Sequence, residues 1–143
     1  MGPKLRAAAD AAASAVAQSS EVYARRAHQW QDARIKIGSL FDSLVRVRPG
    51  AFSQDRNENR NAVWLKIEDG HAVAEVRFFL RADGMVASVY RARRNRVPLA
   101  DGRRFYHDDH RDWEGTIVEI LEAISKAHAS QAPQETADDL EAT

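Results

Sequence analysis

The sequence predicts an α+β protein that consists of a long N-terminal helix, a three-stranded antiparallel meander and a C-terminal helix. Three observations support this prediction. Apolar residues recur at every seventh position through the first third of the 143 residues, two Asp-Gly turns separate segments of alternating apolar residues, and a second helical stripe follows. We expect a helix at residues 1–48, a polar linker at 49–61, a small α+β domain at 62–130 and an acidic disordered tail at 131–143.

The heptad pattern predicts one helix from about Pro3 to Arg48, because Pro3 suits a first helical turn and Pro49-Gly50 ends the pattern. Such a helix would be about 65–70 Å long at about 1.5 Å per residue, which exceeds the span of a compact domain of this size. Part of the apolar seam should therefore fold back on the chain or meet another chain. The residues expected to mediate oligomerisation or partner docking are Val16, Tyr23, Trp30, Ile37 and Leu44.

Period-two alternation predicts strands at residues 62–67, 71–80 and 85–91, and residues 103–107 could add a possible short fourth strand. The last helix should begin near Asp112, a residue that favours the N-cap position, and run to about Ser130. Its apolar stripe comprises Ile117, Ile120, Leu121, Ile124 and Ala127.

Strand alternation also predicts the two faces of the sheet. An apolar face that should pack against the last helix comprises Val63, Leu65, Ile67, Ala72, Ala74, Val76, Phe78, Leu80, Ala87 and Val89. The opposite face comprises Trp64, Lys66, Val73, Glu75, Arg77, Phe79, Ser88 and Tyr90. Aromatic residues interleaved with Lys and Arg could stack on bases or form a protein-binding hot spot. Alternatively, the apolar end of the first helix, Trp30 to Val47, could cover this face.

A basic run at the end of the third strand is the second candidate binding element. It comprises Arg91, Arg93, Arg94 and Arg96, and it would contact either phosphates or an acidic protein surface. The net charge is zero, but residues 1–97 carry seven more basic than acidic residues, and residues 98–143 carry the reverse excess. The order helix, three strands, helix resembles that of double-stranded-RNA-binding domains and of some small dimeric nucleoid-associated proteins. The acidic start of the last helix departs from the first of these.

Histidines and carboxylates cluster just before the last helix, at His107, Asp108, Asp109, His110 and Asp112. Such residues could form a metal-dependent hydrolytic centre, which His71 could join. The cluster is local, however, and Asp residues at a helix start are stabilised by the helix dipole, so we interpret it as a capping region. The chain has no cysteine, and no cofactor is expected.

These patterns favour a non-catalytic macromolecular interaction module, such as an adaptor, an inhibitor or an accessory subunit. Its expected partner is a second copy of itself, another protein, or both. Nucleic-acid binding is the alternative, and metal-dependent hydrolysis is the third hypothesis. No apolar run approaches the roughly 18–20 residues that span a bilayer, so we expect no membrane span. The expected location is cytoplasmic, with which the absence of cysteine is compatible. The Ala- and Arg-rich start also resembles a transit peptide in composition, but the uninterrupted heptad pattern argues against this reading.

Overall fold

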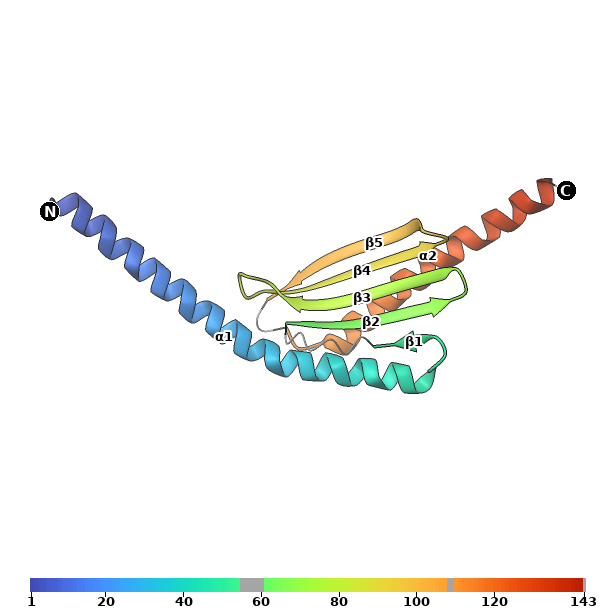
Figure 1. The fold of residues 1–143 in the computed structure, drawn as a ribbon, viewed down its shortest axis with the longest axis horizontal. Helices are drawn as coiled ribbons and strands as arrows, with labels where there is room; N and C mark the ends of the chain where they lie inside the picture. Colours follow the sequence, from blue (N-terminus) through green and yellow to red (C-terminus); the bar gives the residue numbers. More distant parts are fainter. Residues whose placement is uncertain (55–60, 108–109, 143) are drawn as a thin grey trace.

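The computed structural model of the protein describes residues 1–54, 61–107 and 110–142. In chain order its elements are α1 (Pro3–Val47), β1 (Phe52–Ser53), β2 (Ala62–Asp69), β3 (Ala72–Leu80), β4 (Val86–Arg94), β5 (Val97–Tyr106) and α2 (Trp113–Ala142). The five strands form one sheet in the order β1-β2-β3-β4-β5, and each pair is antiparallel (Figure 1). The predicted α+β architecture is confirmed, with five strands rather than three or four.

Helix α1 begins and ends close to the predicted residues. Pro3 occupies its first turn, and the backbone N–H of Arg48 donates to the carbonyl of Leu44 at 3.1 Å before Pro49 and Gly50 end the helix. The helix has two parts with different surroundings. Residues 1–21 are all exposed and project from the sheet, whereas the downstream part buries Trp30 and three further residues (Figure 1).

The sheet differs from the prediction at both edges. Strand β5 begins at Val97 rather than near residue 103, because Asn95 and Arg96 form a two-residue turn with φ of 50° and 68°. Two consecutive positive φ angles fit a type I′ turn, which joins adjacent antiparallel strands directly. At the other edge, β1 lies within the predicted linker at 49–61 and pairs Phe52 with Ile67.

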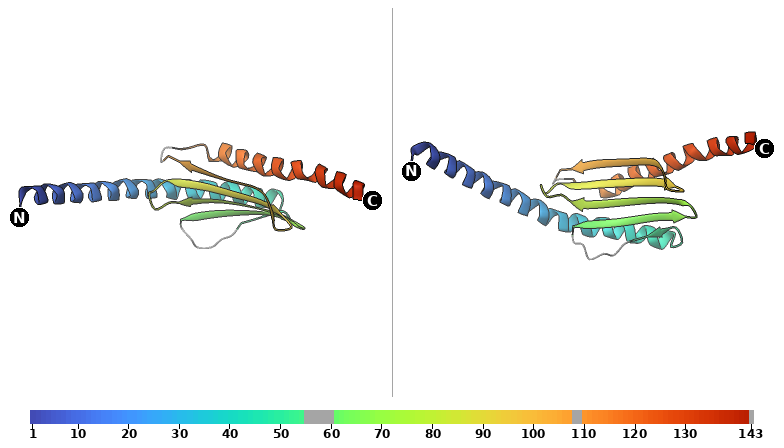
Figure 2. Two further views of the ribbon diagram at one scale, coloured as in Figure 1. Left: turned by 90° about the horizontal axis from the view of Figure 1, so that it is seen from above. Right: turned by 45° about the horizontal axis from the view of Figure 1, so that its top comes forward.

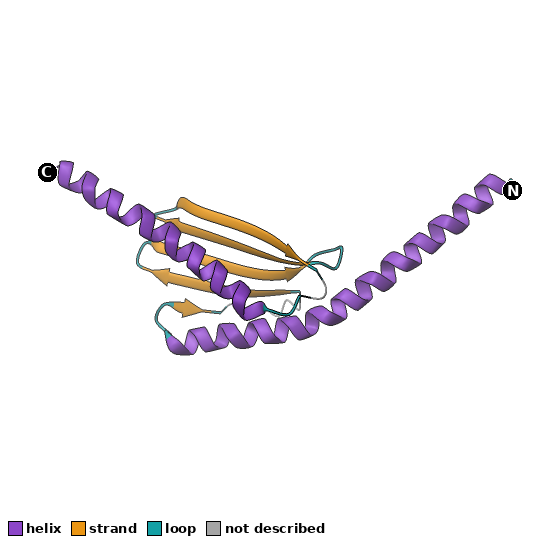
Figure 3. Ribbon diagram, turned by 180° about the vertical axis from the view of Figure 1, so that it is seen from behind, coloured by secondary structure: helices purple, strands orange, loops and turns teal. Residues whose placement is uncertain are grey.

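Both helices pack against the same face of the sheet (Figure 3). Aromatic contacts join the two helices through Phe78 of β3. The ring centroid of Phe78 lies 6.0 Å from that of Phe41 in α1 and 5.9 Å from that of Trp113 in α2. The core cluster comprises Trp30, Ala33, Ile37, Phe41, Val63, Leu65, Ala74, Val76, Phe78, Val86, Tyr106, Trp113, Ile117, Ile120 and Ile124. The alternative that Trp30 to Val47 covers the aromatic face is therefore wrong. The apolar face of the sheet accepts both helical stripes, because each stripe has more apolar surface to bury there.

The predicted face assignment is wrong for β4. Its register places Ser88 opposite Phe78 and Tyr90 opposite Val76, so both point toward the helices, whereas Ala87 and Val89 point away. Ser88 is 3% exposed, and its hydroxyl lies within 3.3 Å of the Tyr106 hydroxyl. This hydrogen bond explains why a polar side chain is tolerated there.

Helix α2 begins as predicted but ends later. The Asp112 carboxylate accepts a hydrogen bond from the Gly115 backbone N–H at 2.9 Å, which confirms the N-cap. The helix then continues past Ser130 to Ala142, through the segment predicted as a disordered tail. Glu, Gln, Ala and Leu, which have high helix propensity, follow Pro133 and favour this continuation. No helix in the described part of the chain is both long and apolar enough to cross a membrane.

Candidate binding surfaces

The sheet face opposite the two helices (Figure 2) carries the predicted Trp64, Lys66, Arg77 and Phe79, whereas the predicted Tyr90 lies on the helix side. We call it the open face, because neither helix packs on it. The strand register arranges it in cross-strand rows. From the β3–β4 turn inward, the rows are Ala62–Phe79–Ala87–Phe105, then Trp64–Arg77–Val89–Arg103, then Lys66–Glu75–Arg91–Asp101.

The first two rows combine arginines with aromatic rings. The Arg77 guanidinium lies 4.9 Å from the Trp64 ring centroid and 4.4 Å from that of Phe79, and Arg81 lies 4.1 Å from that of Phe105. We call these five residues the aromatic–arginine end of the open face. Cation–π stacking keeps the rings covered although no helix lies on them, which is how aromatic residues persist on an open sheet face. Phe105 is nevertheless 45% exposed.

The third row alternates in charge across the strands, as Lys66, Glu75, Arg91 and Asp101. Opposite charges on neighbouring strands attract each other, and the two positive and two negative side chains leave this row with no net charge. Lys66 also contacts Glu68 at 2.8 Å, and Arg93 lies 3.9 Å from Glu75. The hydrogen bond from Lys66 to Glu68, together with their attraction, raises the pKa of Lys66 above its ordinary value.

The predicted basic run does not form one surface. Arg91 and Arg93 lie on the open face, Arg94 lies on the helix side with Ala92, and Arg96 lies in the β4–β5 turn. A groove of about 540 Å³ opens beside this turn and is lined by Lys66, His71, Val73, Glu75, Arg93, Asn95 and Arg96. The Asn95 N–H donates to the His71 carbonyl at 3.0 Å, which holds the two turns of the groove together.

The predicted oligomerisation seam is buried in the domain at its downstream end and exposed at its upstream end. Trp30 and Ile37 are completely buried within this chain, and Leu44 is partly buried against the same core. Val16 is 70% exposed and Tyr23 is 38% exposed. Only the upstream part of the seam is therefore open to another chain.

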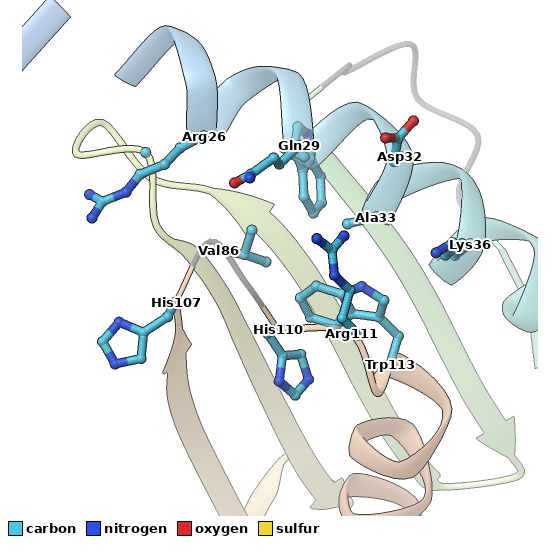
Figure 4. A pocket seen from close by; sticks show the side chains of 12 residues that line it. Arg26, Gln29, Asp32, Ala33, Lys36, Val86, His107, His110, Arg111 and Trp113 are labelled. Carbon is cyan, nitrogen blue, oxygen red and sulfur yellow. The ribbon is translucent and has the colours of Figure 1, made fainter. Parts of the chain in front are cut away.

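His107 and His110 of the predicted metal cluster line a small cavity between α1 and the start of α2 (Figure 4). The cavity measures about 20 Å³, which is about the size of one water and too small for a substrate. The His110 ring packs 4.6 Å from Tyr106 and 4.5 Å from Trp113, and its Nε2 lies 3.0 Å from the Thr116 hydroxyl. His110 therefore supports the start of α2.

The described residues contain no group of three or more His, Asp or Glu side chains that could hold a metal. Asp108, which belongs to the predicted metal cluster with His107 and His110, lies outside the described residues, as does Asp109.

Sequence analysis missed two members of the aromatic–arginine end, Arg81 and Phe105. Phe105 falls in the possible fourth strand at residues 103–107. The residues of that strand that face away from the helices can be identified only from its register with β4. No family model, curated protein or solved structure matches this chain.

Proposed function

We propose that this protein is a non-catalytic interaction module that binds an acidic protein segment at the aromatic–arginine end of the open face. The observation that carries the proposal is the position of Arg77, whose guanidinium lies against both Trp64 and Phe79 on a face that neither helix covers. Trp, Tyr and Arg dominate the energetics of protein interfaces, and rigid stacking reduces the entropy that an arginine loses on binding. A stacked guanidinium can still receive a carboxylate at its N–H edge.

Photo-crosslinking tests this proposal with a matched pair of positions. Phe105 on the open face and Val118 on α2 are 45% and 47% exposed, so a photoreactive amino acid at either position is equally accessible. We expect one protein partner to crosslink at position 105 and not at 118. The substitution Arg77→Gln should weaken that crosslink, whereas Arg104→Gln, on the helix side of β5, should not. Equal crosslinking at 105 and 118, or no effect of Arg77→Gln, would contradict the proposal.

Fluorescence provides a second measurement, because Trp64 is the one tryptophan of the three that the core does not bury. A peptide that contains glutamate and leucine should change the Trp64 emission, whereas its glutamine analogue should change it much less. This difference would show that carboxylates matter for binding.

Nucleic-acid binding is the second candidate, and the groove beside the β4–β5 turn favours it. Arg93, Arg96, Lys66 and His71 bring basic groups to that groove. The alternating charges of the third row argue against a large phosphate-binding surface, which is why we place this candidate second.

Salt dependence separates the two candidates. If Arg93 and Arg96 contact phosphates, replacing both with Gln should reduce the salt slope of nucleic-acid binding by nearly two phosphate equivalents. We expect weak binding to oligonucleotides that this double substitution hardly changes. Tight binding at physiological salt that is lost in the variant would reverse the order of the candidates.

The contacts of His110 with Tyr106, Trp113 and Thr116 favour a structural role of this residue over a role in a metal-dependent hydrolase. A cytoplasmic location remains part of our proposal, since a chain without cysteine is compatible with a reducing compartment.

A further inference from the structure

We propose that the projecting part of α1 pairs antiparallel with the same segment of a second copy, and so forms a homodimer. The surface involved is the upstream stripe, which we define as Leu5, Ala9, Ala12, Val16, Ser19 and Tyr23. This proposal does not depend on the open face, so either proposal can fail without the other.

The upstream stripe continues the part of α1 that the core already buries. Its positions follow the same heptad repeat as Trp30 and Ile37, which are completely buried. The large apolar residues of the projecting part, Leu5 and Val16, are 62% and 70% exposed and both lie on this stripe. A helix that keeps its apolar residues on one line beyond its own domain has the pattern of a helix that packs against another helix.

The residues beside the stripe allow a close approach. Eight of the eleven residues from 7 to 17 are alanine, so two helix axes can approach to about 8 Å. Asp10 and Glu21 lie on the opposite side of the helix, and Arg6 is the charged residue nearest the stripe in this segment. A partner helix would therefore bury little charge.

Charge favours a second copy in the antiparallel orientation. A parallel pair would place Lys4 and Arg6 of both chains together, next to the positive ends of both helix dipoles. An antiparallel pair places these positive groups at opposite ends of the interface. Arg26 lies where the projecting part joins the domain. Its side chain points to its own domain, where it donates a hydrogen bond to the Asp83 carbonyl at 3.1 Å.

The length of the projecting part selects one register. In an antiparallel pair, Leu5 of one copy can lie opposite Tyr23 of the other, with Ala9 opposite Ser19 and Ala12 opposite Val16. A longer overlap would need Trp30, which the core already buries. The bulky Leu5 and Tyr23 then meet at the two ends, and Val16 meets the small Ala12 in the middle, so the stripe complements itself. One dimer would present two copies of the open face.

The interface is small. A projecting helix about 30 Å long and about 10 Å wide can present roughly a third of its side surface, so a pair would bury about 600 Å² in total. Stable dimers usually bury about 1,200 Å² or more, so we expect association in the micromolar range. Measurements must therefore extend to hundreds of micromolar protein.

Sedimentation equilibrium tests the dimer itself. The wild-type mass should rise from that of a monomer toward twice that value as concentration increases. Val16→Glu should keep the protein monomeric, and Ser14→Glu, on the opposite side of α1, should not. Both positions are exposed, so both variants should fold as the wild type does, which circular dichroism would verify. A wild-type protein that stays monomeric at hundreds of micromolar, or equal effects of the two variants, would overturn the proposal.

Disulfide trapping tests the orientation, and the absence of native cysteine makes it unambiguous. An equimolar mixture of Ala12→Cys and Val16→Cys, one of them carrying a tag that changes its mass, is oxidised in a glutathione buffer. The antiparallel register predicts that the mixed disulfide exceeds both self-disulfides several-fold, and that Ser14→Cys traps neither partner. A dominant Val16→Cys self-disulfide would show a parallel pair, and equal trapping by Ser14→Cys would show random collision. Either result would refute the proposed pairing.

Discussion

Two isoleucines on α1 provide a direct measure of how much of the apolar seam belongs to the core of a single chain. Ile37 is completely buried, whereas Ile35 is 64% exposed on the same helix. We compare Ile37→Ala with Ile35→Ala, which remove the same atoms from the same element. The difference between their free energies of unfolding measures the effect of burial, because the change in helix propensity is the same in both.

The expected magnitudes follow from burial. Ile37→Ala removes three buried carbon atoms at about 0.8 kcal/mol each and leaves a cavity, so it should lower the free energy of unfolding by about 3 kcal/mol, within a range of about 2–5 kcal/mol. For a domain of this size that loss should lower Tm by roughly 6–12 °C. Ile35→Ala should change the free energy by less than about 0.5 kcal/mol, and the higher helix propensity of alanine offsets part of any loss.

Urea denaturation followed by circular dichroism at two widely separated protein concentrations measures both effects. The cost of Ile37→Ala should be the same at both concentrations, because Ile37 packs within its own chain. Equal costs for the two substitutions would refute the reasoning. So would a cost of Ile37→Ala that changes with concentration, since an intermolecular seam would produce that result.

Three further substitutions test local features of the fold by urea denaturation. Arg96→Gly should raise the free energy of unfolding by about 1 kcal/mol, because Arg96 has φ of 68° and glycine adopts this conformation without strain; no gain would contradict the turn geometry. Gly102→Ala should lower it by about 1–3 kcal/mol, because a Cβ at this position would lie 2.2 Å from Cε1 of Tyr90; a neutral effect would mean that the Tyr90 ring can move. Asp112→Ala should cost about 1 kcal/mol through the lost hydrogen bond from Gly115, whereas Asp112→Ser should retain most of the stability; equal losses would argue against the N-cap.

The sequence predicts the elements of the fold well where local chemistry determines them. Proline and glycine fix the end of α1, Asp-Gly pairs fix two turns with Gly70 and Gly84 at positive φ, and Asp112 caps α2. These signals act over a few residues, so they can be read without knowledge of the rest of the chain.

Other features depend on contacts between distant residues. The predicted faces of β4 are wrong because Val86, Ala87, Ser88 and Val89 give no clear alternation. Only the pairing with β3 determines which of them face the helices. The side of the sheet that α1 covers was also unpredictable, because a heptad stripe shows that a helix face is apolar but not which partner it meets. The aromatic–arginine end is exposed because α1 packs on the opposite face of the sheet. If α1 packed on the open face, Trp64, Phe79 and Phe105 would lie in the core.

The continuity of α1 through the edge of the domain has a consequence for how its projecting part forms. Starting a helix in water is costly because several residues must be ordered before the first hydrogen bond forms, whereas adding a residue to an existing helix is nearly neutral or favourable for alanine. Residues 26–47 are ordered by the core, so they supply the starting turns, and the alanine-rich segment upstream needs only to propagate from them. A free peptide of residues 1–23 would be largely coil under the same conditions. Unfolding of the sheet would therefore also melt the projecting helix, although its residues 1–21 lie exposed beyond the edge of the domain.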